Sequence, residues 1–342
     1  MWLAARGLQD TAPVPQDPPP PDVPRLSEAR AKITVNANLV VLPVTVKDHS
    51  GRLVPDLGKD EFRIFEDNVE QKIDVFTNEG FPLSVVVLID NDLKKADSKQ
   101  VEDSLAAIVA GMTNVDEAFV CRFDQFFHPG KGFTSDQDKL LVELQRTKLD
   151  SQTSVLSPGG PFYGPSINGH APDGSPSPMP ESTRTILAAP TKALDDAVFG
   201  AAQLLKGRPR NRRKIIFIVS DGLNGGRNYN TNTFDGTVKE LLAHSISVFS
   251  VGVGSAFYDR RFERLSEYAH RTGGDVYYAV KRDSLEELYS RVTEEARYEY
   301  TLAYVPQGTN RAKESHDVEV RVRREGLTIL TRNQYYTGPV AQ

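Results

Sequence analysis

The sequence predicts an α/β fold: a doubly wound, mainly parallel sheet inserted in a small antiparallel β-sandwich. From residue 83 onward, short apolar runs alternate with amphipathic helical patterns. Such runs are typical of strands buried on both faces, as in a parallel sheet covered by helices on two sides. Alternating β patterns occupy both ends of the chain, and neither end alone has enough strands to bury two faces. We therefore expect the two ends to pair with each other.

The parallel sheet should contain five strands separated by helices. The clearest helix lies within 191–205, where apolar residues from Leu194 to Leu205 recur at helical spacing. Pro129 in FFHPGKGF predicts a short antiparallel edge strand, because proline cannot donate to a central ladder. The five apolar runs are 83–89, 118–123, 214–220, 246–252 and 275–280, and further helical stripes lie in 101–112, 262–269 and 285–292.

These patterns divide the chain into four segments. An insertion rich in Pro, Gly and Ser, residues 150–190, interrupts the α/β domain. Its composition fits a loop that carries specificity or a disordered spacer, and Phe162 and Tyr163 are its candidates for ligand contact. The segments are a proline-rich disordered arm over 1–32, half of the sandwich over 33–80, the α/β domain over 81–297 and the other half over 298–342.

Composition excludes several classes of protein. With 39% hydrophobic and 25% charged residues, the chain is typical of a globular protein. A single cysteine excludes an internal disulfide framework, and no apolar run has the length of a transmembrane segment. The net charge of −5 and the lack of a recognition motif argue against nucleic acid, so the basic run 206–214 is interpreted as a solvated loop. No nucleophile is spaced with a base, and we expect no enzymatic activity.

Charged residues gather where three segments should converge. The first strand runs into a charge cluster, another strand ends in VSDG, and the clearest helix begins after a lysine. In open parallel sheets, ligands bind at the carboxyl ends of the strands. Asn91 and Asn224, on the same loops, are candidates for ligand contact. The charged and hydroxyl candidates are Asp90, Asp92, Lys94, Thr191, Lys192 and Asp221.

The arrangement resembles a von Willebrand factor A domain. Such domains carry Asp-x-Ser-x-Ser after the first strand, a Thr before the third helix and an Asp after the fourth strand, which together form a metal-ion-dependent adhesion site. Here Asp90, Asp92 and Lys94 occupy the first motif, Lys192 precedes ALDDAV where the Thr is expected, and Asp221 matches the final Asp. The flanks DEFRIFEDNVEQKIDVF and RVRREGLTILTRNQYY are similar to an acidobacterial-type subfamily of these proteins.

Three interpretations of the cluster are open. Lysine has no lone pair for a metal, so Lys94 and Lys192 would replace the cation by ion pairs, and no cofactor would bind. Alternatively, Asp92 and Thr191 supply ligand oxygens, Lys94 points to solvent, and a Mg²⁺ or Ca²⁺ site survives. In the third interpretation these are ordinary polar turn residues.

The resemblance implies a Rossmann-like domain that binds a protein or peptide. We expect a non-enzymatic binding or adhesion module with a degenerate metal site. The alternative is a structural or scaffolding protein of the cell envelope whose A domain has lost metal-dependent capture. Either function fits a secreted, periplasmic or cell-envelope location.

Overall fold

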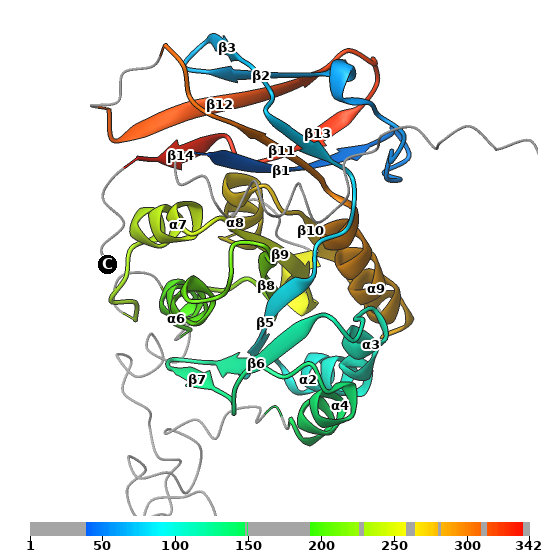
Figure 1. The fold of residues 1–342 in the computed structure, drawn as a ribbon. Coiled ribbons are helices and arrows are strands. Elements are labelled where there is room, and N and C mark those ends of the chain that lie inside the picture. Colours follow the sequence, from blue (N-terminus) through cyan, green and yellow to red (C-terminus); the bar gives the residue numbers. More distant parts are fainter. Residues whose placement is uncertain are drawn as a thin grey trace, which may run out of the picture.

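The computed structural model describes most of the chain between residues 39 and 337 (Figure 1). The predicted arm, the 150–190 insertion and three candidates for the site, Phe162, Tyr163 and Thr191, lie outside the described residues. The described ranges are 39–147, 149, 192–225, 229–257, 264–279, 282–308 and 313–337.

A six-stranded sheet forms the centre of the larger unit, in the order β10-β9-β8-β5-β6-β7. The first five strands in that order are parallel, and β7 pairs with β6 in the antiparallel sense. The predicted strands and the predicted antiparallel edge are therefore confirmed. Their bounds are β5 Leu83–Asp90, β6 Glu117–Phe123, β7 Phe127–Pro129, β8 Arg213–Ser220, β9 Ile246–Gly252 and β10 Val276–Tyr278.

Helices cover both faces of this sheet. Successive side chains of a strand point to opposite sides, so a strand made of apolar residues presents an apolar surface on each face. Val85 and Val87 of β5 pack into one apolar core, whereas Val86 and Leu88 pack into the other. The first core is covered by α2 Lys95–Ser104, α3 Ala106–Ala110, α4 Gln137–Arg146 and α9 Arg282–Tyr298. The second is covered by α6 Leu194–Lys206, α7 Phe234–Ala243 and α8 Arg264–Thr272. We call this sheet with its helices the α/β unit.

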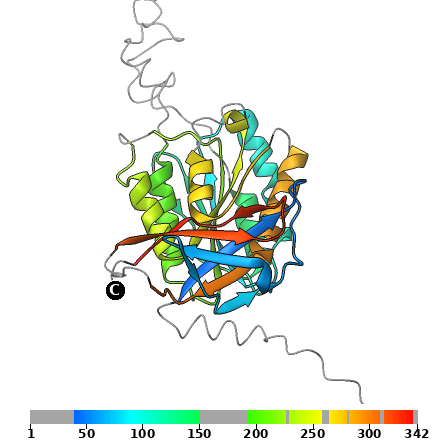
Figure 2. The ribbon, with the colours of Figure 1, turned by 90° about the horizontal axis from the view of Figure 1, so that it is seen from above.

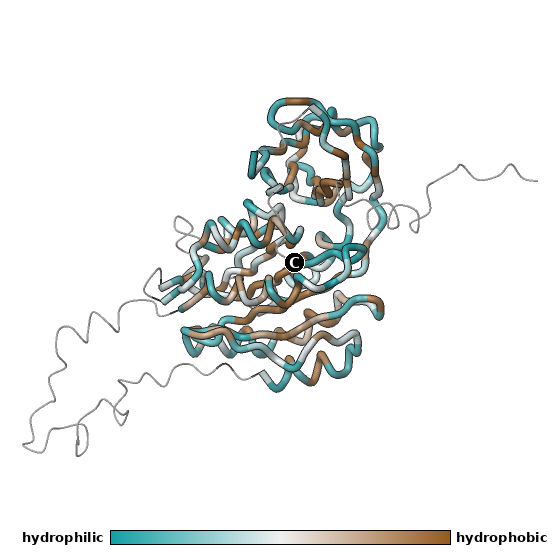
Figure 3. Tube along the Cα trace, turned by 60° about the vertical axis from the view of Figure 1, so that its left-hand side comes forward, coloured by the Kyte–Doolittle hydropathy of each residue, from teal (hydrophilic) through white to brown (hydrophobic). Residues whose placement is uncertain are grey.

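Hydrophobic segments run through the middle of the α/β unit (Figure 3). Two of its helices, α4 and α7, were not predicted from the sequence. Each begins with a side-chain cap: Asp136 accepts a hydrogen bond from the amide of Lys139, and Thr233 accepts one from the amide of Gly236. These caps are the local signals that sequence reasoning left unused.

Two four-stranded sheets form a second unit, which lies against one side of the α/β unit (Figures 1 and 2). Their orders are β13-β1-β11-β4 and β14-β12-β2-β3, so each sheet combines strands from both ends of the chain. Both sheets contribute to one apolar core, which includes Leu42, Ile64, Leu302 and Val320. We call this the two-sheet unit; the domain boundaries drawn from the sequence stay predictions. Its strands are β1 Val40–Lys47, β2 Phe62–Glu66, β3 Val69–Gln71, β4 Val75–Thr77, β11 Tyr300–Tyr304, β12 Ser315–Val322, β13 Thr328–Leu330 and β14 Gln334–Tyr336. Among the described residues, 3-10 turns lie at Lys59–Glu61 and Gly254–Phe257.

The last β segment, LTILTRNQYY, has the sequence pattern of one strand but forms two. It divides into β13, which pairs with β1, and β14, which pairs with β12 in the other sheet. The buried Arg332 lies at the break and donates hydrogen bonds to the carbonyl oxygens of Val41 and Leu242. A charged guanidinium needs such acceptors when it is buried, so the chain leaves the first sheet where Arg332 reaches them.

Buried ion pairs join the two units. The ammonium of Lys47, at the end of β1, lies 2.5 Å from Asp275 and 2.7 Å from Glu295 of the α/β unit. Arg213, at the start of β8, lies 3.1 Å from the carboxylate of Glu299, just before β11. All of these side chains except that of Asp275 are almost fully buried. Separating the units would leave buried charges without their partners, so the ion pairs hold the two units in one relative position.

We predict that deleting residues 298–342 unfolds the strands of segment 40–77. β1 pairs only with β11 and β13 among the described strands, and β2 loses its partner β12. Hydrogen exchange of the deleted chain should show segment 40–77 unprotected, whereas deletion of 338–342, beyond β14, should leave it protected. Protection of 40–77 in the larger deletion would contradict the pairing.

Candidate functional site

The candidate site lies at the carboxyl edge of the six-stranded sheet. β5 and β8 are adjacent and parallel, so they end side by side. β5 ends at Asp90, and Asp221 directly follows the last residue of β8, Ser220. Lys192 lies two residues before the start of α6. The three segments that the sequence predicted to converge therefore do converge, through residues contributed by three separate parts of the chain.

The ammonium of Lys192 bridges the two carboxylates. Its Nζ atom lies 2.8 Å from Oδ2 of Asp90 and 2.8 Å from Oδ1 of Asp221. The residues are 2%, 0% and 7% exposed, so this is a buried network rather than a surface pair. Charge-assisted hydrogen bonds of this length are the strong class in proteins. Lys192 thus links the ends of two neighbouring strands to the segment that leads into α6.

The remaining lone pairs of the carboxylates accept hydrogen bonds from the same loops. The hydroxyl of Ser220 donates to Oδ2 of Asp90 at 2.6 Å, and the amide of Asp92 donates to Oδ1 at 2.9 Å. The amide of Leu223 donates to Oδ1 of Asp221 at 3.1 Å. Each carboxylate therefore orders the turn that follows its own strand, as well as pairing with the lysine.

The cluster of Asp90, Lys192 and Asp221 has one more negative than positive charge when all three groups are ionised. Burial raises the pKa of Asp90 to about 6, and the nearby Asp221 adds to the shift while Lys192 opposes it. Burial alone would lower the pKa of Lys192, but attraction to Asp90 and Asp221 raises it overall. Both shifts have one meaning: the cluster holds its protons more tightly than the separate groups would in water.

Lys94 does not join this cluster. It lies exposed at the N-cap of α2, and it forms no ion pair with Asp90, Asp92 or Asp221 within the described chain. The first of the three interpretations paired both lysines with the carboxylates, whereas the second left Lys94 in solvent. One ammonium already contacts both buried carboxylates, so a second would lose its water without gaining a strong partner. Asp92 is half-buried, and its amide rather than its carboxylate contacts Asp90.

The two candidate asparagines hold loops of the same edge. The amide of Asn91 donates to the carbonyl oxygen of Phe123, and its side chain donates to Asp124 at 3.3 Å. The side chain of Asn224 donates to Asp195 at 2.9 Å. Both positions are therefore tied to neighbouring loops.

Sequence reasoning missed two carboxylates of this edge. Asp124 follows β6 and also contacts His128, while its carbonyl oxygen accepts the amide of Ala193. Asp195 is buried in the first turn of α6 and accepts the hydroxyl of Tyr268 at 2.7 Å. An Asp at the end of the next strand was a usable signal for Asp124. Nothing local in the sequence identifies Tyr268 as the partner of Asp195.

A divalent cation does not fit between these carboxylates in the presence of Lys192. Mg²⁺ needs oxygen ligands at about 2.0–2.1 Å in octahedral geometry. Here the ammonium occupies the space between Asp90 and Asp221, and it has no lone pair to offer. Among the residues that the structure describes, no group of three or more His, Cys, Asp or Glu side chains is arranged to hold a metal ion. Thr191, the remaining predicted ligand, lies outside them.

No protein-family model and no curated protein matches the sequence. Similar solved structures include a von Willebrand factor type A protein from Catenulispora acidiphila, with 10% identity, 88% of this chain and 75% of that chain covered, and a TM-score of 0.44. BatB from Bacteroides thetaiotaomicron has 16% identity, coverage of 63% and 98%, and a TM-score of 0.39. The manganese-loaded TRAP protein of Plasmodium vivax has 11% identity, coverage of 80% and 97%, and a TM-score of 0.40. Likenesses at this level say nothing of what this chain binds.

We predict that Lys192→Met lowers the free energy of unfolding by about 3–5 kcal/mol at pH 7, because it leaves two buried carboxylates without their cation. The matched control, Lys94→Met, removes an exposed ammonium of the same loop system and should change stability by less than about 0.5 kcal/mol. Urea denaturation of both variants measures the difference. Equal losses for the two would show that Lys192 is not the central ion of the cluster.

The loss in Lys192→Met should shrink as the pH falls. The pKa of Asp90 is already raised by burial, and removing the ammonium that opposes this shift moves it further above its value in the unfolded chain. The folded state then binds more protons than the unfolded state, so stability rises as the pH is lowered from 7 toward 4. Urea denaturation at pH 7 and at pH 5 checks this sign. A deficit that stays constant over this range would argue against carboxylate repulsion as its cause.

Proposed function

We propose that the protein is a non-enzymatic binding module of von Willebrand A type that captures a protein or peptide at its carboxyl edge without a metal ion. The observation that carries the proposal is the ammonium of Lys192, 2.8 Å from both Asp90 and Asp221. An adhesion site of this type needs a cation at this place to fix the loops. Here a covalently attached cation supplies that charge, so the edge is ordered permanently and does not depend on Mg²⁺ or Ca²⁺.

The chemistry of the cluster supports binding rather than catalysis. The hydroxyl of Ser220 is fully buried and donates to Asp90, so it is not available as a nucleophile. The raised pKa of Lys192 keeps its amine protonated, which removes it as a general base. The charged groups of the cluster thus serve to hold loops in place, and the surface around them remains for contact with a partner.

Two exposed hydrophobic side chains mark that surface. Phe126 is 63% exposed on the turn between β6 and β7, and Leu223 is 41% exposed on the loop after β8. Both turns begin at carboxyl ends of the sheet, next to the strand that carries Asp90. Aromatic side chains are enriched at the centres of protein interfaces, where a polar rim surrounds a more apolar core. The exposed ammoniums of Lys94 and Lys95 fit such a rim.

We also propose a subfamily and a cellular location for the protein. The flanks that form the two-sheet unit favour the acidobacterial-type subfamily, and we place the protein in the cell envelope or outside the cell. Among the described residues, no helix combines the length and apolar character needed to span a bilayer.

We predict that the protein melts at the same temperature in millimolar Mg²⁺ and in EDTA. The double variant Lys94→Ser, Lys192→Thr restores two of the three hydroxyl positions of the resembling motif and removes both ammoniums. It should melt lower in EDTA and recover in Mg²⁺, because a ligand specific for the folded state at 100 times its Kd stabilises by about 2.7 kcal/mol. Lys94→Ser alone is the control and should not respond. A melting point of the unaltered protein that falls in EDTA would contradict the metal-free proposal.

Capture of a partner tests the binding function. We expect the immobilised protein to retain a defined partner from an extract of cells that produce it naturally, equally well in Mg²⁺ and in EDTA. The double variant Phe126→Ser, Leu223→Ser should lose the partner, since it removes the apolar contacts of the edge. Val69→Ser is the matched control, because Val69 is 43% exposed on β3 of the two-sheet unit, far from the edge in the chain topology.

Each outcome of the capture experiment has one interpretation. Loss in the edge variant alone, with binding that persists in EDTA, supports the proposal. Equal retention by all variants would remove the carboxyl edge as the binding surface and favour the alternative, a structural protein of the envelope. Loss of binding in EDTA would restore the metal-dependent interpretation.

A further inference from the structure

A cavity of about 790 Å³ lies at the opposite edge of the sheet, between the α/β unit and the two-sheet unit. Its α/β side is formed by the loop after α6, the start of β8 and the turn before β9. Its other side is formed by β1, by Thr301 of β11 and by the segment around Arg332. The volume lies within the range of pockets that hold small organic ligands, about 300–1,000 Å³.

Cations dominate the lining of this cavity. Within the part of the chain that the structure describes, no Asp or Glu side chain lines it. Apolar and aromatic residues, among them Phe81, Leu242 and Tyr335, form the rest of the wall. The seven lining Lys and Arg residues are Lys206, Arg208, Arg210, Arg212, Arg213, Lys214 and Arg332.

Four of these cations are already paired with carboxylates that do not themselves line the cavity. Glu117 pairs with both Arg208 and Arg212, Glu240 pairs with Lys206, and Glu299 pairs with Arg213, which accounts for all four. They hold the loops that build the cavity.

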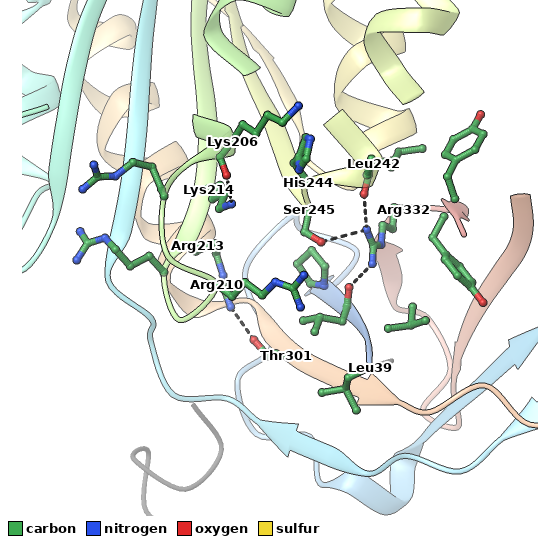
Figure 4. A pocket seen from close by; sticks show the side chains of 18 of the residues that line it. Leu39, Lys206, Arg210, Arg213, Lys214, Leu242, His244, Ser245, Thr301 and Arg332 are labelled. Atoms are coloured by element: carbon green, nitrogen blue, oxygen red, sulfur yellow. Dashed lines mark hydrogen bonds between the residues drawn. The ribbon is translucent and has the colours of Figure 1, made fainter. Parts of the chain in front are cut away.

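The other three cations have no carboxylate partner in the described chain. Figure 4 shows Arg210 extending from its loop toward Arg332, with Lys214 and His244 on the α/β side. Lys214 is 7% exposed, and its ammonium donates to the carbonyl oxygen of Lys206 at 3.3 Å. The Nε atom of Arg332, a residue 4% exposed, is buried without a hydrogen-bond partner among the described residues.

Burial without a carboxylate partner lowers the pKa of two of these three cations. Burial lowers the pKa of Lys214 to about 8, and the positive charges of Arg210 and Arg208 add to the shift. Burial also lowers the pKa of Arg332 to about 10. Burying cations without counter-charges is costly, and a cation with a shifted pKa in a cavity is a candidate for a functional site.

We propose that this cavity binds a small organic phosphate, with the phosphate group between Arg210, Lys214 and Arg332 and the organic body against the apolar wall. A dianion matches three uncompensated cations better than a single carboxylate does, and the planar guanidinium groups suit phosphate oxygens. Inorganic phosphate would leave most of the volume unfilled. The site uses no residue of the carboxyl edge, so it stands independently of the proposed capture function.

Calorimetric titration of the full chain with phenyl phosphate at low salt tests the proposal. We expect saturable binding that is tighter than that of inorganic phosphate and absent for phenyl glucoside, which lacks the charge. Arg210→Gln and Lys214→Met should each weaken binding about tenfold or more, the usual effect of losing a hydrogen bond to a charged group. Arg323→Gln removes an exposed arginine that does not line the cavity, and binding should not change.

Folding is checked by melting each variant before titration. Arg210 is exposed, so its variant keeps the fold and carries the test even if Lys214→Met does not fold. Three results would overturn the proposal: no saturable binding of phenyl phosphate, equal weakening by Arg323→Gln, or binding of a DNA oligonucleotide that phenyl phosphate does not displace. The last result would identify the basic loop as a surface for nucleic acid instead.

Discussion

The ion pairs of Lys192 connect three loops that no strand pairing holds together. Taking an ammonium and two carboxylates out of water is costly, and the cost is offset only while both contacts of the ammonium exist. The loops after β5 and β8 and the segment before α6 are therefore ordered as a set. The two hydrogen bonds that Asp90 accepts from Ser220 and from the amide of Asp92 extend the same order into the adjoining turns. Everything proposed for the carboxyl edge depends on this set being complete.

The charged residues of β8 lie at its two ends because its middle is buried. The strand is buried along its whole length, with its middle residues in the two apolar cores on either side. Charged side chains are excluded from such a strand except where a partner or solvent is near. Arg213 and Lys214 therefore lie at its start, beside the cavity, and Asp221 directly follows its end. The charges that belong to β8 are therefore basic at its start and acidic directly after its end.

Much of the fold follows from local pattern, and the site follows only in part. Apolar runs and helical stripes identify the parallel strands because burial on both faces leaves a direct record in the sequence. The positions of Asp90 and Asp221 follow from strand ends and topology alone. The roles of the two lysines do not: Lys94 and Lys192 have the same chemistry, and only the three-dimensional structure shows that one is buried and the other exposed. The break at Arg332 and the cavity beside it depend on contacts between residues far apart in the chain, which no local pattern records.

We expect the carboxyl edge and the cavity at the opposite edge to act independently, because β8, the strand between them, transmits little electrostatic or structural change. Eight residues of β8 separate its ends by roughly 23 Å at about 3.3 Å per residue. At an effective dielectric of about 20, two unit charges at that distance interact by less than about 1 kcal/mol, which is small beside the about 4 kcal/mol of a contact pair. Coupling through structure would require an element with two alternative arrangements. β8 is paired with β5 on one side and with β9 on the other along nearly its whole length. Neither electrostatics nor a shift of the strand therefore links the cavity between the two units to the cluster of Asp90, Lys192 and Asp221.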